Sequence, residues 1–240
     1  MEIHVFKTEH ALLRALANFF VATAAAAIAE RGTCNVSLSG GRSPEKLYAL
    51  LASPDFSRRV DWQKVCFFFG DERYVPADHP DSNALMATRT LFDPLGVAAA
   101  QIFRVDTSRS PLAAAQAYTA AIMAHFQGQP ACFDLVLLGL GADAHTASLF
   151  PHTPVLPEPS ASVQAVFLEK QQVYRLTMTA PLLNQARQIA FLVYGEDKAD
   201  AVQRVLQGAP DPGQYPAQLI RPPAGEVHWF LDETAAAALG

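Results

Sequence analysis

The sequence predicts a single α/β domain over residues 1–240. Its sheet is mostly parallel and Rossmann-like, with helices on both faces and a small antiparallel element in the C-terminal third. Strand-like and helix-like segments alternate along the chain, which is the first observation behind this fold class. Several strand-like segments are apolar throughout, as in strands buried on both faces of a parallel sheet. In addition, no linker or internal repeat interrupts the 240 residues, half of which are hydrophobic.

The strand-like segments are short runs rich in branched aliphatic and aromatic residues. The pattern predicts strands over 3–7, 34–39, 65–69, 101–105, 133–141, 163–169, 173–179, 189–195 and 227–232. Nearly every residue of VCFFF (65–69) and FDLVLLGLG (133–141) is apolar, which favours central, buried strands. The segments 163–169 and 173–179 are joined by KQQ, which predicts an antiparallel pair.

The helix-like segments lie between these strands. We expect helices over 10–30, 44–51, 82–92, 112–126, 180–186 and 196–207, with a helical tail after 232. Pro44 and Ser82 provide start signals, a first-turn proline and a cap. The apolar stretch ALANFFVATAAAAIA follows residues of mixed charge and is too short to span a bilayer. We therefore expect a packed helix there rather than a signal peptide.

Composition excludes several classes of partner. A net charge of −5 without a cluster of basic residues argues against a nucleic-acid surface, and no membrane partner is expected. Cys34, Cys66 and Cys132 lack metal-ligand spacing and are expected to be buried, reduced thiols, which indicates a cytoplasmic protein. His79 and His145 also lack metal-site companions at recognisable spacing, so no metal is expected. Composition does not determine the oligomeric state.

Ligands of open parallel sheets bind outside the carboxyl ends of the strands, so the loops at these ends are expected to carry the functional residues. The loop in SLSGGRSPEKLY combines two glycines, Gly40 and Gly41, with Arg42 and Ser43 at a helix start. Glycines allow close approach of the backbone, and helix N-terminal amides favour a phosphate, with Ser43 as a natural N-cap. A plain tight turn with a Ser–Pro cap remains an alternative.

The second loop follows the strand 65–69 with Asp71, Glu72 and Arg73. Charges directly after a buried strand are costly unless they pair or meet a polar ligand. The functional interpretation makes Arg73 an anion or oxyanion donor and lets Asp71 bind sugar hydroxyls. The alternative is an internal ion-pair network. Ser82 and Asn83 are expected to cap the next helix rather than contact a substrate.

The third loop contains His145, the only histidine that closely follows a buried strand in a glycine-bearing loop. A histidine is the usual proton acceptor for activating water. Asp143 either fixes its tautomer or caps the local turn. In the fourth loop, Lys198 lies in the first turn of a helix, where cations are normally disfavoured. A bound anion would explain it, and an exposed lysine on a solvated face is the alternative.

Five segments together resemble a known family: SGGRSP, GDERYVPADHPDSN, FDLVLLGLGADAHTASLFP, RLTMTAPLLNQARQIAFLVYGEDKA and YPAQLI…WFLD. They look like the soluble 6-phosphogluconolactonases, which are related in fold to glucosamine-6-phosphate isomerase/deaminase. The resemblance covers nearly the whole chain in order. It implies hydrolysis of 6-phospho-glucono-1,5-lactone in the pentose phosphate pathway, without a cofactor and with a phosphorylated sugar lactone as the partner.

The resemblance also implies site residues. His145 is the expected general base, with Asp143 and Arg73 beside it and the phosphate near Gly41–Ser43 and Lys198. The family usually has glycine where this chain has Ala144. Alanine at positive φ would cost about 1–2 kcal/mol, so we predict a negative φ there.

Two alternatives to lactone hydrolysis are a sister enzymatic activity and a non-catalytic binding role. The isomerase/deaminase carries a proton-transferring glutamate where this chain has Phe150, which favours the lactonase. A non-catalytic module that binds sugar phosphates is the other alternative, and the presence of both Asp143 and His145 counts against it.

Overall fold

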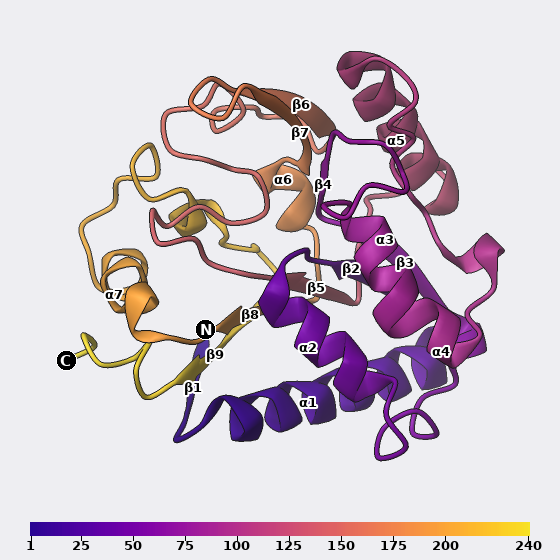
Figure 1. Cartoon of the computed structure of the whole chain (residues 1–240), viewed down its shortest axis with the longest axis horizontal. Helices are drawn as coiled ribbons and strands as arrows, with labels where there is room; N and C mark the ends of the chain where they lie inside the picture. The colour runs from indigo at the N-terminus through magenta and orange to yellow at the C-terminus, as the bar shows by residue number, and fades with distance from the viewer.

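The computed structural model describes all 240 residues and has a six-stranded parallel sheet at its centre (Figure 1). In spatial order the strands are β1 (Glu2–Phe6), β9 (Glu226–Asp232), β8 (Gln188–Val193), β5 (Leu135–Leu138), β2 (Cys34–Leu38) and β3 (Val65–Phe69). Every neighbouring pair is parallel, which confirms the predicted main sheet. The first and last strands of the chain pair with each other, so both ends of the sequence contribute to the same edge of the sheet.

A second, antiparallel sheet packs on the first. Its strands are β4 (Asp71–Arg73), β7 (Val173–Met178) and β6 (Val163–Leu168). The hairpin of β6 and β7 confirms the predicted antiparallel pair. The third strand, β4, was not predicted, because its three residues are all charged. The backbone can leave β3 and join the second sheet here because the carbonyl of Gly70 accepts from the amide of Met178 at 2.8 Å.

The helices fall on the two faces of the main sheet (Figure 1). One face is covered by α1 (Glu9–Arg31), α2 (Arg42–Leu51), α3 (Asn83–Ala87), the π-helix η2 (Thr88–Phe92) and α4 (Asp93–Leu95). The other face carries the second sheet with α5 (Pro111–His125), α6 (Ala180–Leu183) and α7 (Ala199–Leu206). Short 3₁₀ turns complete the chain: η1 (Trp62–Lys64), η3 (Ala99–Gln101), η4 (Glu196–Lys198) and η5 (Pro216–Leu219).

Alternating residues of the strands fill two separate cores. Phe67 and Phe69 point into the core beneath α1 and α2, whereas Phe68, between them, points into the core beneath the second sheet. This two-sided burial follows from the period of two along a strand, and it explains why the central strands are apolar at every position.

Helix α1 has the length and hydropathy of a membrane-crossing helix, with a window of mean hydropathy 1.7. One side of it is nevertheless packed in the core, with Leu12, Leu16 and Phe20 fully buried. The helix begins where the hydroxyl of Thr8 accepts from the amide of Ala11. The prediction of a packed helix is therefore confirmed.

Two predicted elements are wrong. Residues 101–105 form only one bridge, from Ile102 to Phe67, rather than a strand. The reason is Tyr118, whose hydroxyl donates to the carbonyl of Phe103 at 3.1 Å and so occupies the acceptor that a strand would use. The tail after Asp232 forms turns instead of a helix, because the amides of Ala237 and Leu239 donate to carbonyls three residues back rather than four.

Candidate active site

A cavity of about 270 Å³ opens at the carboxyl ends of β2, β5 and β8. Its walls contain eight of the nine residues predicted for the site: Gly40, Gly41, Arg42, Ser43, Asp71, Arg73, His145 and Lys198. The ninth, Asp143, does not line the cavity. Four loops that are far apart in sequence therefore meet at one place, as expected for the carboxyl ends of neighbouring parallel strands.

The first loop joins β2 to α2 through two glycines. Gly41 is the N-cap of α2 with a φ of +102°, a conformation that side chains rarely adopt. Ser43 therefore lies in the first turn, and the expectation that Ser43 is the N-cap is wrong. At Gly40, a Cβ would lie 1.9 Å from Oδ1 of Asn83. Both glycines are thus required by geometry, one for its dihedral angle and the other for a close approach.

The second loop splits its charges between two sides of β4. Asp71 is buried, and its Oδ2 accepts from the Ser148 hydroxyl at 2.6 Å. Asn83 holds the same strand by donating to the carbonyl of Asp71 at 3.0 Å. Arg73 reaches the cavity and donates to the carbonyl of Asp81 at 2.9 Å. Asp71 and Arg73 share the face of β4 that lines the cavity, as residues two apart on a strand do.

Glu72 points the other way and holds the start of α3. Its buried carboxylate accepts from the backbone amides of Arg73, Asn83 and Ala84 at 2.7–2.8 Å. Burial raises the pKa of Glu72 in spite of these three bonds. The hydroxyl of Ser82 caps α3 by accepting from Leu85, as predicted. The charge cluster is accordingly a helix cap on one side of the strand and a cavity wall on the other, not an internal ion-pair network.

His145 is oriented by Asp143 in the third loop. The Oδ1 atom of Asp143 lies 2.5 Å from Nδ1 of His145 and also accepts from the backbone amide of His145 at 3.2 Å. The aspartate thus performs both predicted roles, fixing the ring and bracing the turn. The hydrogen bond from His145 holds the pKa of Asp143 below its usual range. Since Asp143 occupies Nδ1, the ring presents Nε2 as its second nitrogen.

The turn that carries this pair corrects the prediction for Ala144, whose φ is +61°. The amide of Ala144 donates to the carbonyl of Gly141 at 2.9 Å, and the amide of Gly141 donates to the carbonyl of His145 at 2.8 Å. These bonds close a tight turn whose last residue must be left-handed, as in a three-residue hairpin loop. The closed turn, which sequence alone does not reveal, imposes the strained conformation.

The fourth loop leaves β8 through Gly195, which has a φ of +101°. Lys198 ends the short η4 turn and is the N-cap of α7. Its ammonium lies 3.0 Å from the carboxylate of Asp197, and its side chain is one-quarter exposed. The neighbouring aspartate partly neutralises the lysine. Even so, Lys198 lines the same cavity as Gly40 and Gly41.

Several residues of the site were not predicted. Thr146 and Tyr194 line the cavity, and the hydroxyl of Thr146 bonds to the carbonyl of Gly139 at 2.8 Å. Ser148 lies behind the wall and holds Asp71. Their position directly after buried strands or within the His145 loop was the only signal in the sequence. Threonine, serine and tyrosine are common in loops, so their presence there does not by itself indicate a functional site. Arg175 lies opposite Arg73 in the second sheet, and burial, together with the charge of Arg73, lowers its pKa.

Comparisons with known proteins identify the family of the chain. The family model described as glucosamine-6-phosphate isomerases/6-phosphogluconolactonase matches residues 7–229. A 6-phosphogluconolactonase of Synechocystis sp. is 44% identical over 213 residues, which cover 87% of this chain and 86% of the relative. One of Nostoc sp. is 36% identical over 241 residues, covering 99% and 98%.

Solved structures extend the similarity to three dimensions. The 6-phosphogluconolactonase from Trypanosoma cruzi superimposes with a TM-score of 0.88 at 28% identity, covering 99% of this chain and 96% of that one. A monomeric glucosamine-6-phosphate deaminase shares the fold with a TM-score of 0.84 at 21% identity. The match of sequence, fold and topology over nearly the full length leads to one conclusion: the chain belongs to the glucosamine-6-phosphate isomerase/6-phosphogluconolactonase family.

Proposed function

We propose that this chain hydrolyses 6-phospho-D-glucono-1,5-lactone to 6-phospho-D-gluconate, a step of the pentose phosphate pathway, with His145 as the general base. The relatives named as 6-phosphogluconolactonases support the reaction. The observation that carries the role of His145 is its geometry: the ring lines the cavity, while Asp143, which is not part of the lining, holds its Nδ1. Such a histidine is suited to removing a proton from water.

The reaction follows from this arrangement. The lone pair on Nε2 of His145 takes a proton from water as the water oxygen attacks C1 of the lactone. The carbonyl oxygen becomes an oxyanion, which Arg73 or backbone amides stabilise. When the tetrahedral intermediate collapses, the bond from C1 to the ring oxygen breaks, and the protonated His145 returns its proton to that oxygen. No cofactor or metal takes part in these steps.

The remaining predicted residues bind the substrate. The amides at Gly40 and Gly41, the side chains of Arg42 and Ser43, and the ammonium of Lys198 surround a position suited to a phosphate. Ser148 occupies Oδ2 of Asp71, whereas Oδ1 accepts only a long hydrogen bond from Asn83 at 3.5 Å and retains acceptor capacity. We assign this oxygen to the sugar hydroxyls. Holding the phosphate fixes the distance and angle between C1 and the water.

Phe150 favours hydrolysis over the sister reaction. Its ring stacks on the imidazole of His145, with centroids 4.1 Å apart and planes inclined by 25°. The phenyl ring cannot transfer the proton that ring opening of an amino sugar phosphate requires. It also covers one face of His145 with apolar surface, which restricts the approach of solvent from that side.

We further propose that residues 1–240 act as one domain in the cytoplasm. The first strand, β1, pairs with the last, β9, within the same sheet, which supports a single unit. The three cysteines are unpaired, which suits a reducing compartment.

The experiment that tests the base is His145→Ala, assayed by lactone hydrolysis corrected for the spontaneous reaction. We expect kcat to fall by on the order of 10²–10⁴-fold. His10→Ala, an exposed histidine on α1, serves as the matched control and should keep parental activity. Activity of His145→Ala within a few-fold of the parent would overturn the assignment. Release of ammonia from glucosamine 6-phosphate by the parent enzyme would instead favour the sister reaction.

A further inference from the structure

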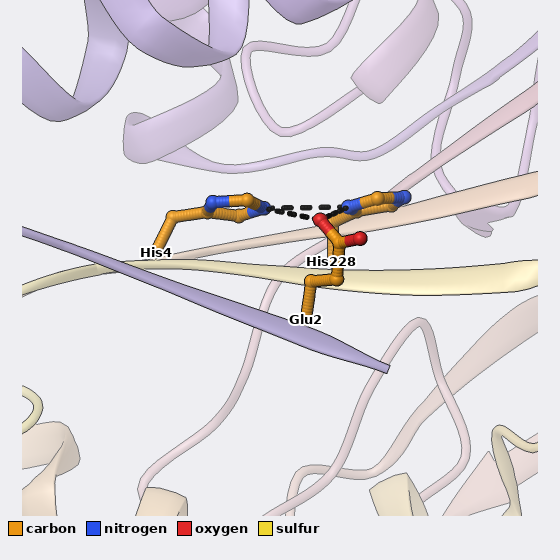
Figure 2. A group of neighbouring side chains, drawn as sticks. All are labelled: Glu2, His4 and His228. Atoms are coloured by element: carbon orange, nitrogen blue, oxygen red, sulfur yellow. Dashed lines mark hydrogen bonds and ion pairs between the residues drawn. The ribbon is translucent and has the colours of Figure 1, made fainter.

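Glu2, His4 and His228 converge near the amino ends of β1 and β9, away from the cavity at the carboxyl ends (Figure 2). Nε2 of His4 lies 3.3 Å from Nδ1 of His228. The Oε2 atom of Glu2 lies 3.5 Å from Nε2 of His4 and 3.4 Å from Nδ1 of His228. Figure 2 shows the two rings pointing nitrogen to nitrogen, with the carboxylate beside the gap between them.

These separations have the size of the edges of a metal coordination polyhedron. In a tetrahedral zinc site, bonds to nitrogen and oxygen of about 2.0–2.1 Å place the ligand atoms about 3.3–3.4 Å from one another. The three separations observed here, 3.3, 3.4 and 3.5 Å, are close to that value. One ion can therefore contact all three atoms without a large shift of the backbone.

A second layer of hydrogen bonds orients the buried histidine for this role. Nε2 of His228 lies 2.8 Å from Oε1 of Gln188. The amide nitrogen of Gln188 donates to Glu226 at 3.1 Å, which fixes the orientation of the amide and makes Oε1 the acceptor for His228. The proton of the neutral ring is thus on Nε2, and Nδ1 directs its lone pair toward Glu2 and His4. Metal-binding histidines are commonly held in this way.

Packing holds the rings, and solvent reaches the opposite side. The ring of His4 stacks on Phe230 at 4.9 Å, and Phe19 packs on His228 at 4.6 Å. The side chain of His228 is 6% exposed, whereas those of His4 and Glu2 are 33% and 62% exposed. The cluster therefore has a rigid inner wall and an open outer side, from which an ion and a water ligand can approach.

We propose that Glu2, His4 and His228 form a binding site for Zn²⁺, with water as the fourth ligand. Two imidazoles and one carboxylate suit zinc among the common divalent ions, since Mg²⁺ and Ca²⁺ prefer oxygen ligands only. Bound here, the ion would tie β1, the outermost strand of the sheet, to β9. The site is structural and does not depend on the reaction proposed above.

The test uses untagged, EDTA-treated protein that carries His145→Ala, so that the pair Asp143–His145 does not contribute a second site. Isothermal titration with Zn²⁺ is expected to give one equivalent bound per chain, and Zn²⁺ but not Mg²⁺ should raise Tm. Co²⁺ bound in the same position should show the intense visible absorption of a four-coordinate site. His4→Phe, which keeps the stacking on Phe230, and Glu2→Gln should each weaken binding by on the order of tenfold or more.

His10→Ala in the same background is the matched control and should bind Zn²⁺ like the parent. Gln188→Leu removes the group that orients His228 and should weaken binding by about 10–100-fold. Circular dichroism and Tm without metal establish that each variant folds, and the exposed Glu2→Gln keeps the test valid if His4→Phe does not fold. The proposal is overturned if the background protein binds no stoichiometric Zn²⁺. It is also overturned if both ligand variants bind as tightly as the background protein does.

Discussion

Histidines at the two ends of the parallel strands differ in the sequence separation from their partner residues. At the carboxyl ends, His145 takes its partner Asp143 from within one tight turn. At the amino ends, His228 meets His4 across 224 positions of the sequence. A pair of residues within one loop can be recognised from their spacing in the sequence. A cluster of residues from different strands forms only when the strands pair in the correct register. Motif searches therefore find the first kind of site and miss the second.

After replacement of His145 itself, Gly141→Ala is expected to have the largest effect on the carboxyl-end site. A Cβ at this position would lie 2.0 Å from Nδ1 of His145 and 2.5 Å from Oδ1 of Asp143, so the pair must move. Misplacement by about 1 Å costs on the order of 100-fold in rate, and we expect kcat to fall by about that factor. Steady-state hydrolysis of the lactone measures it.

The control for this change is Gly213→Ala, whose Cβ meets only an ordinary contact 3.5 Å away, at Asp211. It should retain parental kcat. Zinc binding at the amino ends should be the same in both variants, because the two sites lie at opposite ends of the strands. A parental kcat in Gly141→Ala would show that the geometry of His145 and Asp143 does not limit the reaction.

Lys198→Ala should act on substrate binding rather than on chemistry. A hydrogen bond to a charged group contributes about 1.5–3 kcal/mol, so KM should rise by about 10–100-fold with kcat little changed. Lys64→Ala is the matched control at the amino ends, since Lys64 also pairs with a nearby aspartate, Asp61, at 3.3 Å. An effect of Lys198→Ala on kcat alone would contradict a phosphate-binding role.

Glu72→Gln tests how much the contact between β4 and the start of α3 contributes to stability. The amide group of glutamine would face the backbone amide of Ala84, now bonded to Glu72 at 2.8 Å, and leave that donor unpaired. We expect a loss of about 1–3 kcal/mol in the free energy of unfolding at about pH 4.5, measured by urea denaturation, and a smaller loss at higher pH, where the contribution of Glu72 itself declines. Unchanged stability would mean that the cap on α3 is dispensable.

The same variant has a signature in its pH dependence. Because burial raises the pKa of Glu72 in the folded state, the folded protein binds this proton more tightly than the unfolded chain. The contribution of Glu72 to stability is thus present below its ordinary pKa and is lost as pH rises through the raised value. Glu72→Gln should lack this decline when Tm is followed upward from about pH 4.5.

Ala144→Gly should have the smallest effect. Glycine would relieve about 1–2 kcal/mol of left-handed strain. It would also add about 0.5–1 kcal/mol of unfolding entropy and remove one buried methyl group, a loss of about 0.8 kcal/mol. We expect the free energy of unfolding to stay within about 1 kcal/mol of the parent, with kcat unchanged. A large fall in kcat would show that the methyl group itself positions His145.

Much of the fold could be predicted because periodicity and start signals act locally. The strand β3 was predicted with the limits that it has, Val65–Phe69, because every residue is apolar. The strand β4 was missed because Glu72 is buried by bonds to the backbone of α3, a compensation that hydropathy does not register. Residues 101–105 are of types that favour a strand, but the hydroxyl of Tyr118 occupies the carbonyl of Phe103, an acceptor that a strand would need.

The sequence by itself determined the alternation of strands and helices, the sidedness of the loops and the pair Asp143–His145, because these depend on neighbours in the chain. Only the tertiary structure decided that Ala144 adopts a positive φ, that Ser148 braces Asp71, and that Asp143 lies outside the lining of the cavity. The same is true of the cluster near the amino ends. Each of these depends on a closed turn or on a contact between distant strands, and such contacts arise from packing rather than from the order of residues.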